Sequence, residues 1–315
     1  MDRKLRLRLA IGICIVIFCL QSGIFNMVAA ALSQKEVLSV LLFLQTGRVT
    51  HFSVPAPTAP EIPAQTQPTI PTNPPDKLTF GAAEIPSVQY FCDYRPDLEA
   101  LLTQDLDFSL RDDSPTVLIL HSHATESYSG TKNYRSLDDR ENMIAIGAEI
   151  ARVLEESGIR VLHDQNYHDH PDYNASYPSA RSSIRSYLER YPTIQMVLDI
   201  HRDASDSPSG QLITSATVGG QKSAQLMMVV GTDAGGNTHP DWQENLSLAL
   251  KLTTLLEQEN PGISRPISLR SERFNMDLTA GSLLIEVGAA GNTLAEAKIA
   301  ANALAQAIVT LADGA

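Results

Sequence analysis

The stretch Thr116-Val-Leu-Ile-Leu120, followed by His121-Ser-His123-Ala-Thr-Glu126, decides the fold and the candidate site of this chain. The apolar, β-branched run predicts a buried strand, and it stops abruptly at two histidines and a glutamate. His123 and Glu126 are three residues apart, so on a tight turn they share a face. Imidazole and carboxylate groups presented together are suitable zinc ligands. This turn therefore predicts half of a zinc site, whose other members must come from elsewhere in the chain.

Composition restricts the classes of protein to which the chain can belong. Of its 315 residues, 43% are hydrophobic and 19% are charged, as expected for a globular protein with a core. The net charge of −12, with no basic patch to offset it, excludes nucleic acid as the partner. Only Cys92 of the three cysteines lies outside the N-terminal apolar run, which excludes a disulfide framework and a CxxC metal site. Any metal must therefore be held by histidine and carboxylate.

The first 32 residues are expected to target the chain to the membrane. A basic start precedes the apolar stretch Leu9–Leu32, a combination that directs export and retains the N-terminus inside. Leu9–Leu20 alone would suit a cleaved signal peptide, whereas the whole stretch has about the 20-residue length that spans a bilayer. We expect an uncleaved, single-pass anchor. In either case the bulk of the chain lies outside the cytoplasmic membrane.

A linker is expected between the anchor and the globular part. Within residues 33–76, prolines alternate with threonine, alanine and glutamine from Val54 to Pro75. Such a segment cannot bury a core, so we expect a semi-rigid tether. It would hold residues 77–315, the predicted extracytoplasmic domain, away from the membrane.

Strands and helices alternate through residues 77–315. Apolar runs predict strands, and amphipathic patterns with capping residues predict helices; Thr293-Leu-Ala-Glu296 is a capping box. The predicted strands cover 116–120, 159–163, 193–200, 224–231 and 282–288, and the predicted helices cover 140–157, 179–190, 241–258 and 293–311. Residues 88–110 have no assignment. This alternation predicts an α/β fold, a mostly parallel, twisted sheet flanked by helices on both faces.

Four candidate residues lie where such a sheet binds ligands, beyond the carboxyl ends of its strands. They are His123, Glu126, His201 and Glu286. Taken singly, His201 is equally well a hydrogen-bonded loop histidine, and Glu126 a helix cap. Glu286 interrupts an apolar strand, and an unpaired buried carboxylate costs several kcal/mol. Glu286 therefore needs a cation, a proton or a place at the edge of the sheet.

Together these residues fit one mechanism. His123, Glu126 and His201 would give zinc three protein ligands and leave the fourth position to water, as a catalytic zinc site requires. Glu286 would be the general base that takes the proton of that water and returns it to a leaving amine.

Further residues are candidates for supporting roles. His121 is expected to support the site rather than bind metal, and Asp199 and Asp203 are candidate acceptors for imidazole N–H groups. Arg202 or Arg273 would stabilise the oxyanion or bind a substrate carboxylate, although surface salt bridges explain both arginines at least as well. Four other histidines lack matching partners and are not expected to be ligands: His163, His168, His170 and His239.

Four ordered motifs resemble those of the stage II sporulation protein P family. They are His121-Ser-His-Ala-Thr-Glu-Ser-Tyr128, Asp199-Ile-His-Arg-Asp-Ala204, Arg273-Phe-Asn-Met-Asp-Leu278 and Leu284-Ile-Glu-Val-Gly288 with Asn292-Thr293. The resemblance runs from Asp113 to the C-terminus, and the N-terminal anchor and proline-rich tether also match.

The resemblance implies a fold and an activity. The family is a peptidoglycan hydrolase, similar in fold to zinc N-acetylmuramoyl-L-alanine amidases and more remotely to zinc carboxypeptidases. It implies an amidase that removes stem peptides from glycan strands, with endopeptidase activity on cross-links. It also implies work during engulfment of the forespore, in the intermembrane space of the sporangium. The implied partners are stage II sporulation proteins D, a lytic transglycosylase, and M, a membrane protein.

The resemblance also implies roles for residues of this chain. His123, Glu126 and His201 take the metal positions, and Glu286 takes the catalytic position. The His-x-x-Glu spacing is that of the carboxypeptidases. In the amidases the ligand glutamate lies further on, near a helix start, so Glu141 is the alternative to Glu126.

One motif departs from the family's pattern. The usual Asn-Gln-Asp is Asn275-Met276-Asp277 here, so a polar contact at Met276 is expected to be missing. Asn275 is a further candidate for a supporting or substrate-binding role.

The expected function is therefore that of a membrane-anchored, zinc-dependent peptidoglycan amidase. Two alternatives come from other classes. One is a catalytically silent wall-binding module that recruits other hydrolases, and the other is a zinc carboxypeptidase acting on free peptides. A binding module has no need of a catalytic base, and a carboxypeptidase needs a dedicated clamp for the terminal carboxylate.

Overall fold

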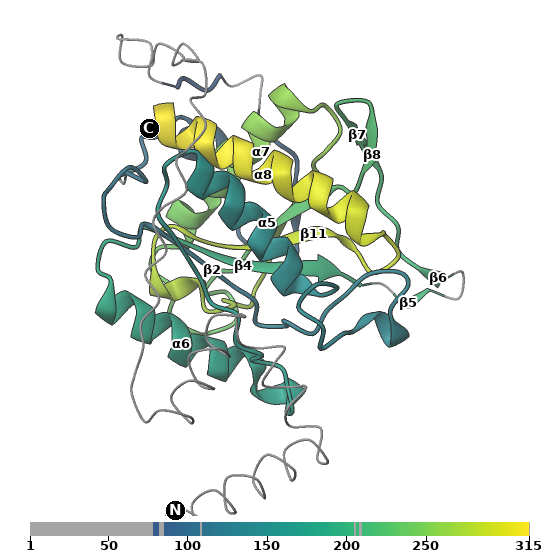
Figure 1. The fold of residues 1–315 in the computed structure, drawn as a ribbon. Coiled ribbons are helices and arrows are strands. Elements are labelled where there is room, and N and C mark those ends of the chain that lie inside the picture. The colour runs from purple at the N-terminus through teal and green to yellow at the C-terminus, as the bar shows by residue number, and fades with distance from the viewer. Residues whose placement is uncertain (1–77, 82–84, 108, 205, 208–209, 315) are drawn as a thin grey trace, which may run out of the picture. The chain divides into compact units, whose positions relative to one another are not determined.

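A mixed sheet lies at the centre of the computed structural model, which describes residues 78–81, 85–107, 109–204, 206–207 and 210–314 (Figure 1). The sheet contains Val88–Tyr90 (β1), Val117–Leu120 (β2), Val161–His163 (β3), Met196–Asp203 (β4), Leu226–Val230 (β9), Ile267–Leu269 (β10) and Ser282–Ala289 (β11). Within the described residues its order is β1-β10-β9-β11-β4-β2-β3. The expected anchor and linker, residues 1–76, lie outside the described residues.

Within this sheet, strand pairing is parallel except between β9 and β11. β11, β4, β2 and β3 run parallel to one another, whereas β9 pairs antiparallel with β11, and β10 and β1 run parallel to β9. β2 is buried along its whole length, as is usual for a strand covered by helices on both faces. The carboxyl ends of β2, β4 and β11 therefore meet at one edge of the sheet.

Helices cover both faces of the sheet. Figure 1 shows α5 and α8 side by side on one face, together with α7, and α6 on the opposite face. This arrangement confirms the expected α/β fold with a mostly parallel sheet. The helices are Leu98–Thr103 (α4), Met143–Glu156 (α5), Ser176–Arg190 (α6), Trp242–Glu259 (α7) and Leu294–Gly314 (α8), with short 3₁₀ turns at Lys132–Tyr134 (η2), Tyr173–Ala175 (η3) and Met276–Leu278 (η4). Two short hairpins complete the fold, Asp206–Ser207 with Gly210–Gln211 (β5 and β6) and Ala216–Val218 with Gln221–Ser223 (β7 and β8).

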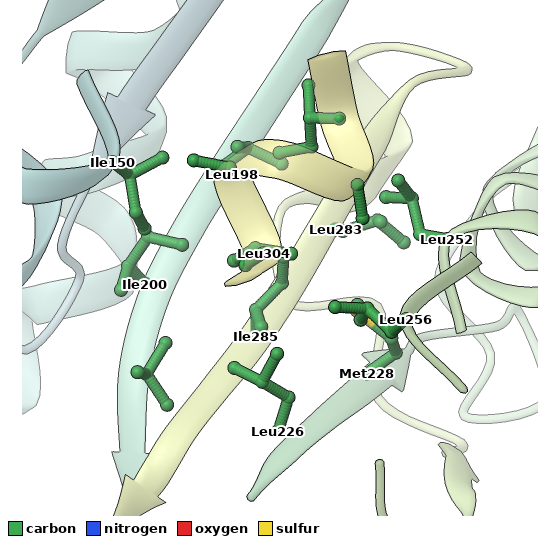
Figure 2. Close-up of a cluster of buried hydrophobic side chains, with 14 of the residues drawn as sticks. Ile150, Leu198, Ile200, Leu226, Met228, Leu252, Leu256, Leu283, Ile285 and Leu304 are labelled. Carbon is green, nitrogen blue, oxygen red and sulfur yellow. The ribbon is translucent and has the colours of Figure 1, made fainter. Parts of the chain in front are cut away.

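The largest core cluster lies between the sheet and the helices α5, α7 and α8. Alternate residues of the central strands point into it, including Leu198 of β4 and Ile285 of β11 (Figure 2). They meet side chains such as Leu252 of α7 and Leu304 of α8, all fully buried. Each such side chain stabilises the fold by roughly 1.5–3 kcal/mol relative to exposure. The strands that carry the candidate site are therefore fixed by the core beneath them.

Helix α8 is apolar because it belongs to this core. Among the described residues, it is the one helix long and apolar enough to cross a membrane by length and composition, yet half of it is buried inside the domain. The predicted capping box is confirmed at its start, since the amide of Glu296 donates to Thr293 Oγ1 and the amide of Thr293 donates to Glu296 Oε2.

Several boundaries differ from the sequence prediction. β4 covers Met196–Asp203 rather than 193–200, so His201 lies inside the strand and not after it. α5 begins at Met143 rather than at residue 140, because the side chain of Asn142 accepts the first free amide, that of Ile144, at 2.9 Å. The unassigned residues 88–110 contain β1 and α4, and β10 was also not predicted. β1 and β10 have three residues each, too few to show a period in the sequence.

Two histidines, buried His121 and half-buried His163, join three strands next to each other in the sheet. His121 Nδ1 donates to the carbonyl oxygen of Ile200 at 3.0 Å, which leaves His121 Nε2 to accept from His163 Nε2 at 2.9 Å. A Cβ added at Gly147 of α5 would lie only 2.5 Å and 2.6 Å from these two Nε2 atoms, so glycine is required there. Burial lowers the pKa of His121 to about 3 and that of His163 to about 4. Both rings are therefore neutral at physiological pH.

Replacing His163 by glutamine tests this neutral pair. An unfolded histidine gains a proton as the pH falls through 6.5, whereas folded His163 resists protonation down to about 4. The folded state therefore loses stability across this range, by up to about 1.4 kcal/mol per pH unit. Glutamine keeps an N–H for His121 but does not titrate. In metal-free urea unfolding, we expect the wild type to lose stability relative to His163→Gln as the pH falls from 6.5 to about 4.

Subtracting the free energy of unfolding of His163→Gln from that of the wild type at each pH cancels the contributions of the other titrating groups. Glu286 is one of them, since burial raises its pKa to about 8 and it acts with the opposite sign over the same range. If this difference in the free energy of unfolding does not change with pH, the conclusion that folded His163 is neutral is wrong.

Gly288, two residues after Glu286, offers a test of the packing at the end of β11. Its φ is +73°, and an added Cβ would lie 2.7 Å from Cβ of Ala224. Gly220 has a similar φ of +78° but open space around it. Both alanine variants place a side chain in the left-handed region, at a cost of about 1–2 kcal/mol, but only Gly288→Ala adds a steric overlap. We expect Gly288→Ala to lower the free energy of unfolding by at least about 1 kcal/mol more than Gly220→Ala. Equal losses would show that the backbone at the end of β11 shifts to relieve the overlap.

Candidate functional site

The turn after β2 is fastened to β4 by hydrogen bonds. The amide and hydroxyl of Ser122 both donate to the carboxylate of Asp199, at 2.8 Å and 2.5 Å. The amide of Glu126 donates to the carbonyl of His123 at 3.0 Å, which closes the turn. The side chains of His123 and Glu126 are both buried, as is His201 of β4. The turn and the strand therefore bring these three predicted site residues together.

His201 lies between two carboxylates. Its Nε2 is 2.9 Å from Asp199 Oδ1, and its Nδ1 is 3.5 Å from Glu126 Oε2. Burial opposes protonation of the ring, but the two carboxylates outweigh burial and hold the pKa of His201 well above its usual range. Burial likewise opposes ionisation of Asp199, but its hydrogen bonds and the charge of His201 lower the pKa of Asp199 to about 2.

Glu126 is held from its other side by Arg202. The guanidinium Nη1 of Arg202 is 3.4 Å from Glu126 Oε1, and the amide of Arg202 is 3.4 Å from Oε2. Arg202 is buried and also donates to the carbonyl oxygens of Ser127 and Tyr134. These contacts and His201 lower the pKa of Glu126, although burial opposes ionisation. Arg202 therefore positions the glutamate and has no face toward a substrate.

His123 is packed among aromatic rings. It stacks on Tyr173 with ring centres 4.5 Å apart, and it meets the edges of Tyr177 at 5.5 Å and His201 at 5.3 Å. Burial lowers the pKa of His123, so the ring is neutral at physiological pH. Its Nδ1 is buried without a hydrogen-bond partner in the described part of the chain, and the nearest carboxylate oxygen, of Asp169, is 4.0 Å away. A buried neutral nitrogen without a partner is suited to bind a further group.

Glu286 of β11 lies directly opposite His201 of β4 in the parallel register. Its Oε2 is buried and has no hydrogen-bond partner among the described residues. Burial raises the pKa of Glu286 to about 8, with the charge of His201 opposing the rise. The sequence left three possibilities for this carboxylate: a cation, a proton or a place at the edge of the sheet. β11 is a central strand, which excludes the edge, and the raised pKa favours a proton. A carboxyl group with a pKa near neutrality can both accept and return a proton.

The donor set suits a zinc ion. Among the described residues no group of three ligating side chains stands close enough together to hold a metal as they are placed. The chemistry of the donors nevertheless fits. His201 uses Nε2 for a carboxylate and turns Nδ1 toward Glu126, the arrangement usual for metal-bound histidines, and His123 contributes a buried nitrogen without a partner. A cation bound there would replace the proton on His201 Nδ1.

Glu141, the alternative to Glu126, lies elsewhere. It is exposed, and its carboxylate accepts a hydrogen bond from the hydroxyl of Ser136 at 3.2 Å. In the described part of the chain no hydrogen bond or ion pair joins it to His123 or His201.

Two of the predicted supporting residues lie apart from the imidazoles. Asp203 pairs with Arg265 at 2.6 Å, and among the described residues no hydrogen bond or ion pair joins it to a histidine. Arg273 is 3.4 Å from Asp277 and donates to the carbonyl of Thr238, so it supports a neighbouring loop.

Asn275 acts on the site through Tyr177. Its side-chain amide donates to the carbonyl of Tyr177 at 2.9 Å, and the ring of Tyr177 packs against His123. Asn275 and Phe274 have positive φ angles of 62° and 48°, a conformation that asparagine tolerates but that is strained for phenylalanine. The expected loss of a polar contact at Met276 is only partial, because its sulfur accepts a hydrogen bond from the amide of Gly231 at 3.2 Å.

Sequence reasoning missed two residues of this region. They are Asp169 and Arg135. Asp169 is buried and accepts hydrogen bonds from Arg135 and from the amide and hydroxyl of Thr125, which precedes Glu126 in the turn. Neither Asp169 nor Arg135 lies at the end of a strand, so no pattern in the sequence distinguishes them. The tyrosines of residues 167–178 predict the rim of a binding cleft, and two of them, Tyr173 and Tyr177, pack against His123.

Comparison with known proteins gives distant structural neighbours. No curated protein matches the chain. The solved structures include the amidase AmiC2 of Nostoc punctiforme (13% identity, TM-score 0.38, covering 62% of this chain and 94% of that chain) and the CwlD amidase of Clostridioides difficile in complex with the GerS lipoprotein (13%, 0.40, 62% and 98%). They also include the N-acetylmuramyl-L-alanine amidase Ami1 of Mycobacterium smegmatis (13%, 0.40, 63% and 97%). At these TM-scores the likeness carries no statement about activity.

A family model gives the more direct match. The model of stage II sporulation protein P matches residues 64–309, well over half of the chain. That range contains the four sequence motifs and every residue of the site described above. The chain therefore belongs to the stage II sporulation protein P family.

Proposed function

We propose that the chain is a zinc-dependent peptidoglycan hydrolase that cleaves the amide bond between N-acetylmuramic acid and L-alanine. Membership of a sporulation family supports a role in the sporangium. The observation that carries the chemistry is the buried group at the carboxyl ends of β2, β4 and β11. It combines His201 between two carboxylates, His123 with a nitrogen that has no partner among the described residues, and Glu286 opposite His201.

In this proposal His123, Glu126 and His201 hold the metal. Asp199 fixes the ring of His201 through Nε2, and Arg202 fixes the carboxylate of Glu126. When bound, zinc supplies Lewis-acid chemistry, which polarises the scissile carbonyl and lowers the pKa of water to about 7.

Glu286 moves the proton. Its ionised carboxylate would accept the proton of the attacking water and deliver it to the nitrogen of L-alanine as that amine leaves. Burial is the main cause that raises the pKa of Glu286 to about 8, and a nearby cation favours the ionised form that the base needs. A binding module would derive no benefit from a buried carboxyl group with an oxygen that has no partner, because such a group costs stability.

The place of action is part of the proposal. Residues 1–32 would anchor the chain as a single membrane span and residues 33–76 would extend it, so that the hydrolase acts on the wall in the intermembrane space of the sporangium. Stage II sporulation proteins D and M are the proposed partners, and cross-link cleavage is a proposed second activity.

Release of stem peptides from purified sacculi tests the proposed reaction. We expect the wild-type chain to release peptides that begin with L-alanine, and a chelator to abolish the release until zinc is restored. Glu286→Gln removes the base but keeps the size of the side chain, and should lower the rate about 10²–10⁴-fold with zinc still bound. His123→Ala should lose both zinc and activity. Activity that survives chelation, or that survives both substitutions, would refute the zinc amidase.

Zinc content separates the two candidate ligands. Glu126 contacts His201, whereas Glu141 is exposed. We therefore expect Glu126→Gln to weaken zinc binding by more than the roughly tenfold that the loss of a supporting residue costs. Glu141→Gln should leave the affinity unchanged. The measurement is a competition titration with a chromophoric chelator, and the reverse result would transfer the ligand role to Glu141.

A further inference from the structure

A cavity lies beside the candidate site. Its volume is about 450 Å³, and its lining includes Thr125, Arg135, Leu137, Asp169 and Tyr173. Tyr173 belongs to both regions, because the same ring lines this cavity and stacks on His123. A substrate bound at His123 therefore has this cavity as its immediate neighbour.

Arg135 has a hydrogen-bonding edge that the protein does not use. Its Nη1 donates to Thr125 Oγ1 at 2.7 Å and to Asp169 Oδ2 at 3.2 Å. In the described part of the chain, its Nε and Nη2 have no hydrogen-bond partner, and the side chain is 38% exposed. The Nε and Nη2 edge of a guanidinium is a planar fork that matches the two oxygens of a carboxylate.

The protein holds this arginine in place from its other side. Asp169 is fully buried and is itself fixed by the amide and hydroxyl of Thr125. The guanidinium carbon of Arg135 also lies 4.8 Å from the centre of the Tyr173 ring. The used edge and the ring contact together preorganise the free edge, which reduces the ordering cost of binding a ligand.

Arg135 is separated from His123 by a single aromatic ring. One aromatic ring, that of Tyr173, contacts both His123 and Arg135. Successive residues of a peptide are about 3.8 Å apart, so a group at Arg135 belongs to a residue close to the cleaved bond and not to a distant one.

We propose that this cavity binds the acidic peptide part of the substrate, with the carboxylate of the residue after L-alanine on Nε and Nη2 of Arg135. The aliphatic part of that residue would lie against Tyr173 and the exposed side chain of Leu137. This inference rests on the proposed amidase activity, whose substrate class it narrows to peptides with a free carboxylate at this position.

A pair of matched substrates tests the inference. Glycan chains that carry an L-alanyl-D-glutamyl stem are compared with the same chains in which that glutamyl carboxylate is amidated. The full chain should cleave the acid form with a kcat/KM at least about tenfold higher, mainly through KM, because a charge-assisted hydrogen bond is lost with the amide.

Variants of Arg135 should remove the preference. Arg135→Lys keeps a charge beside Asp169, and so should keep the fold, but it lacks the fork and should retain little of the preference. Arg135→Met should bring the ratio for the two substrates to within about twofold. Arg140→Met is the control, since Arg140 is exposed and pairs with Asp138, and it should leave the ratio unchanged. Equal losses on both substrates in the Arg135 variants would show a merely structural arginine and overturn the inference.

A binding measurement distinguishes failure of this inference from failure of the proposed function. Zinc-loaded Glu286→Gln chain is titrated with the soluble stem peptide in acid and amidated form. A preference for the acid form that disappears in the Arg135→Lys background supports the subsite even if sacculi are not cleaved. Equal affinities for the acid and amidated peptides overturn the subsite. Cleavage of both substrates at equal rates by the wild type also overturns the subsite, but it supports the proposed amidase activity.

Discussion

The site depends on one interaction, the imidazole of His201 held between the carboxylates of Asp199 and Glu126. Burying a charged ring costs a large desolvation energy, and only carboxylates at 2.9 Å and 3.5 Å make this position stable. The two partners come from different parts of the chain, since Asp199 shares β4 with His201 and Glu126 lies on the turn after β2. The same contact therefore determines how that turn packs on the sheet, and it places a nitrogen and a carboxylate where a proton or a cation can be shared.

Strand pairing turns this contact into an arrangement capable of catalysis. In the parallel register of β4 with β11, Glu286 lies opposite His201, and one of its oxygens has no partner in the part of the chain that the structure describes. Such a group lowers stability, and so does the strained backbone at Phe274, whose φ is positive. The cost is offset by the fully buried side chains below, Leu198 and Ile285 among them. Stability comes from one side of the central strands, and reactivity is concentrated at their carboxyl ends.

The sequence predicts the parts of this structure that depend on local periodicity. Apolar runs gave β2, β4 and β11, and their ends pointed to His123, His201 and Glu286. The antiparallel placement of β9 has no local signal, because it depends on which strands pair in space. Asp169 could not be found for the same kind of reason, since its partner Thr125 is 44 residues away and its loop has no period. His163 was set aside as lacking a partner, yet it bonds to His121 across 42 residues of sequence.

Arginines show most clearly why residue type alone is insufficient. Arg202 and Arg273 were candidates to bind the substrate because they lie within motifs, but Arg202 is fully occupied. It donates from all three of its nitrogens, to Glu126 and to two carbonyl oxygens, whereas Arg273 contacts Thr238 and Asp277 through Nη1. A guanidinium whose N–H groups are already satisfied gains little from a new acceptor, whereas one held by a single edge is both ordered and available. Because a sequence shows where arginines are and not which of their donors are free, a substrate-binding arginine becomes visible only once every neighbouring acceptor has been placed.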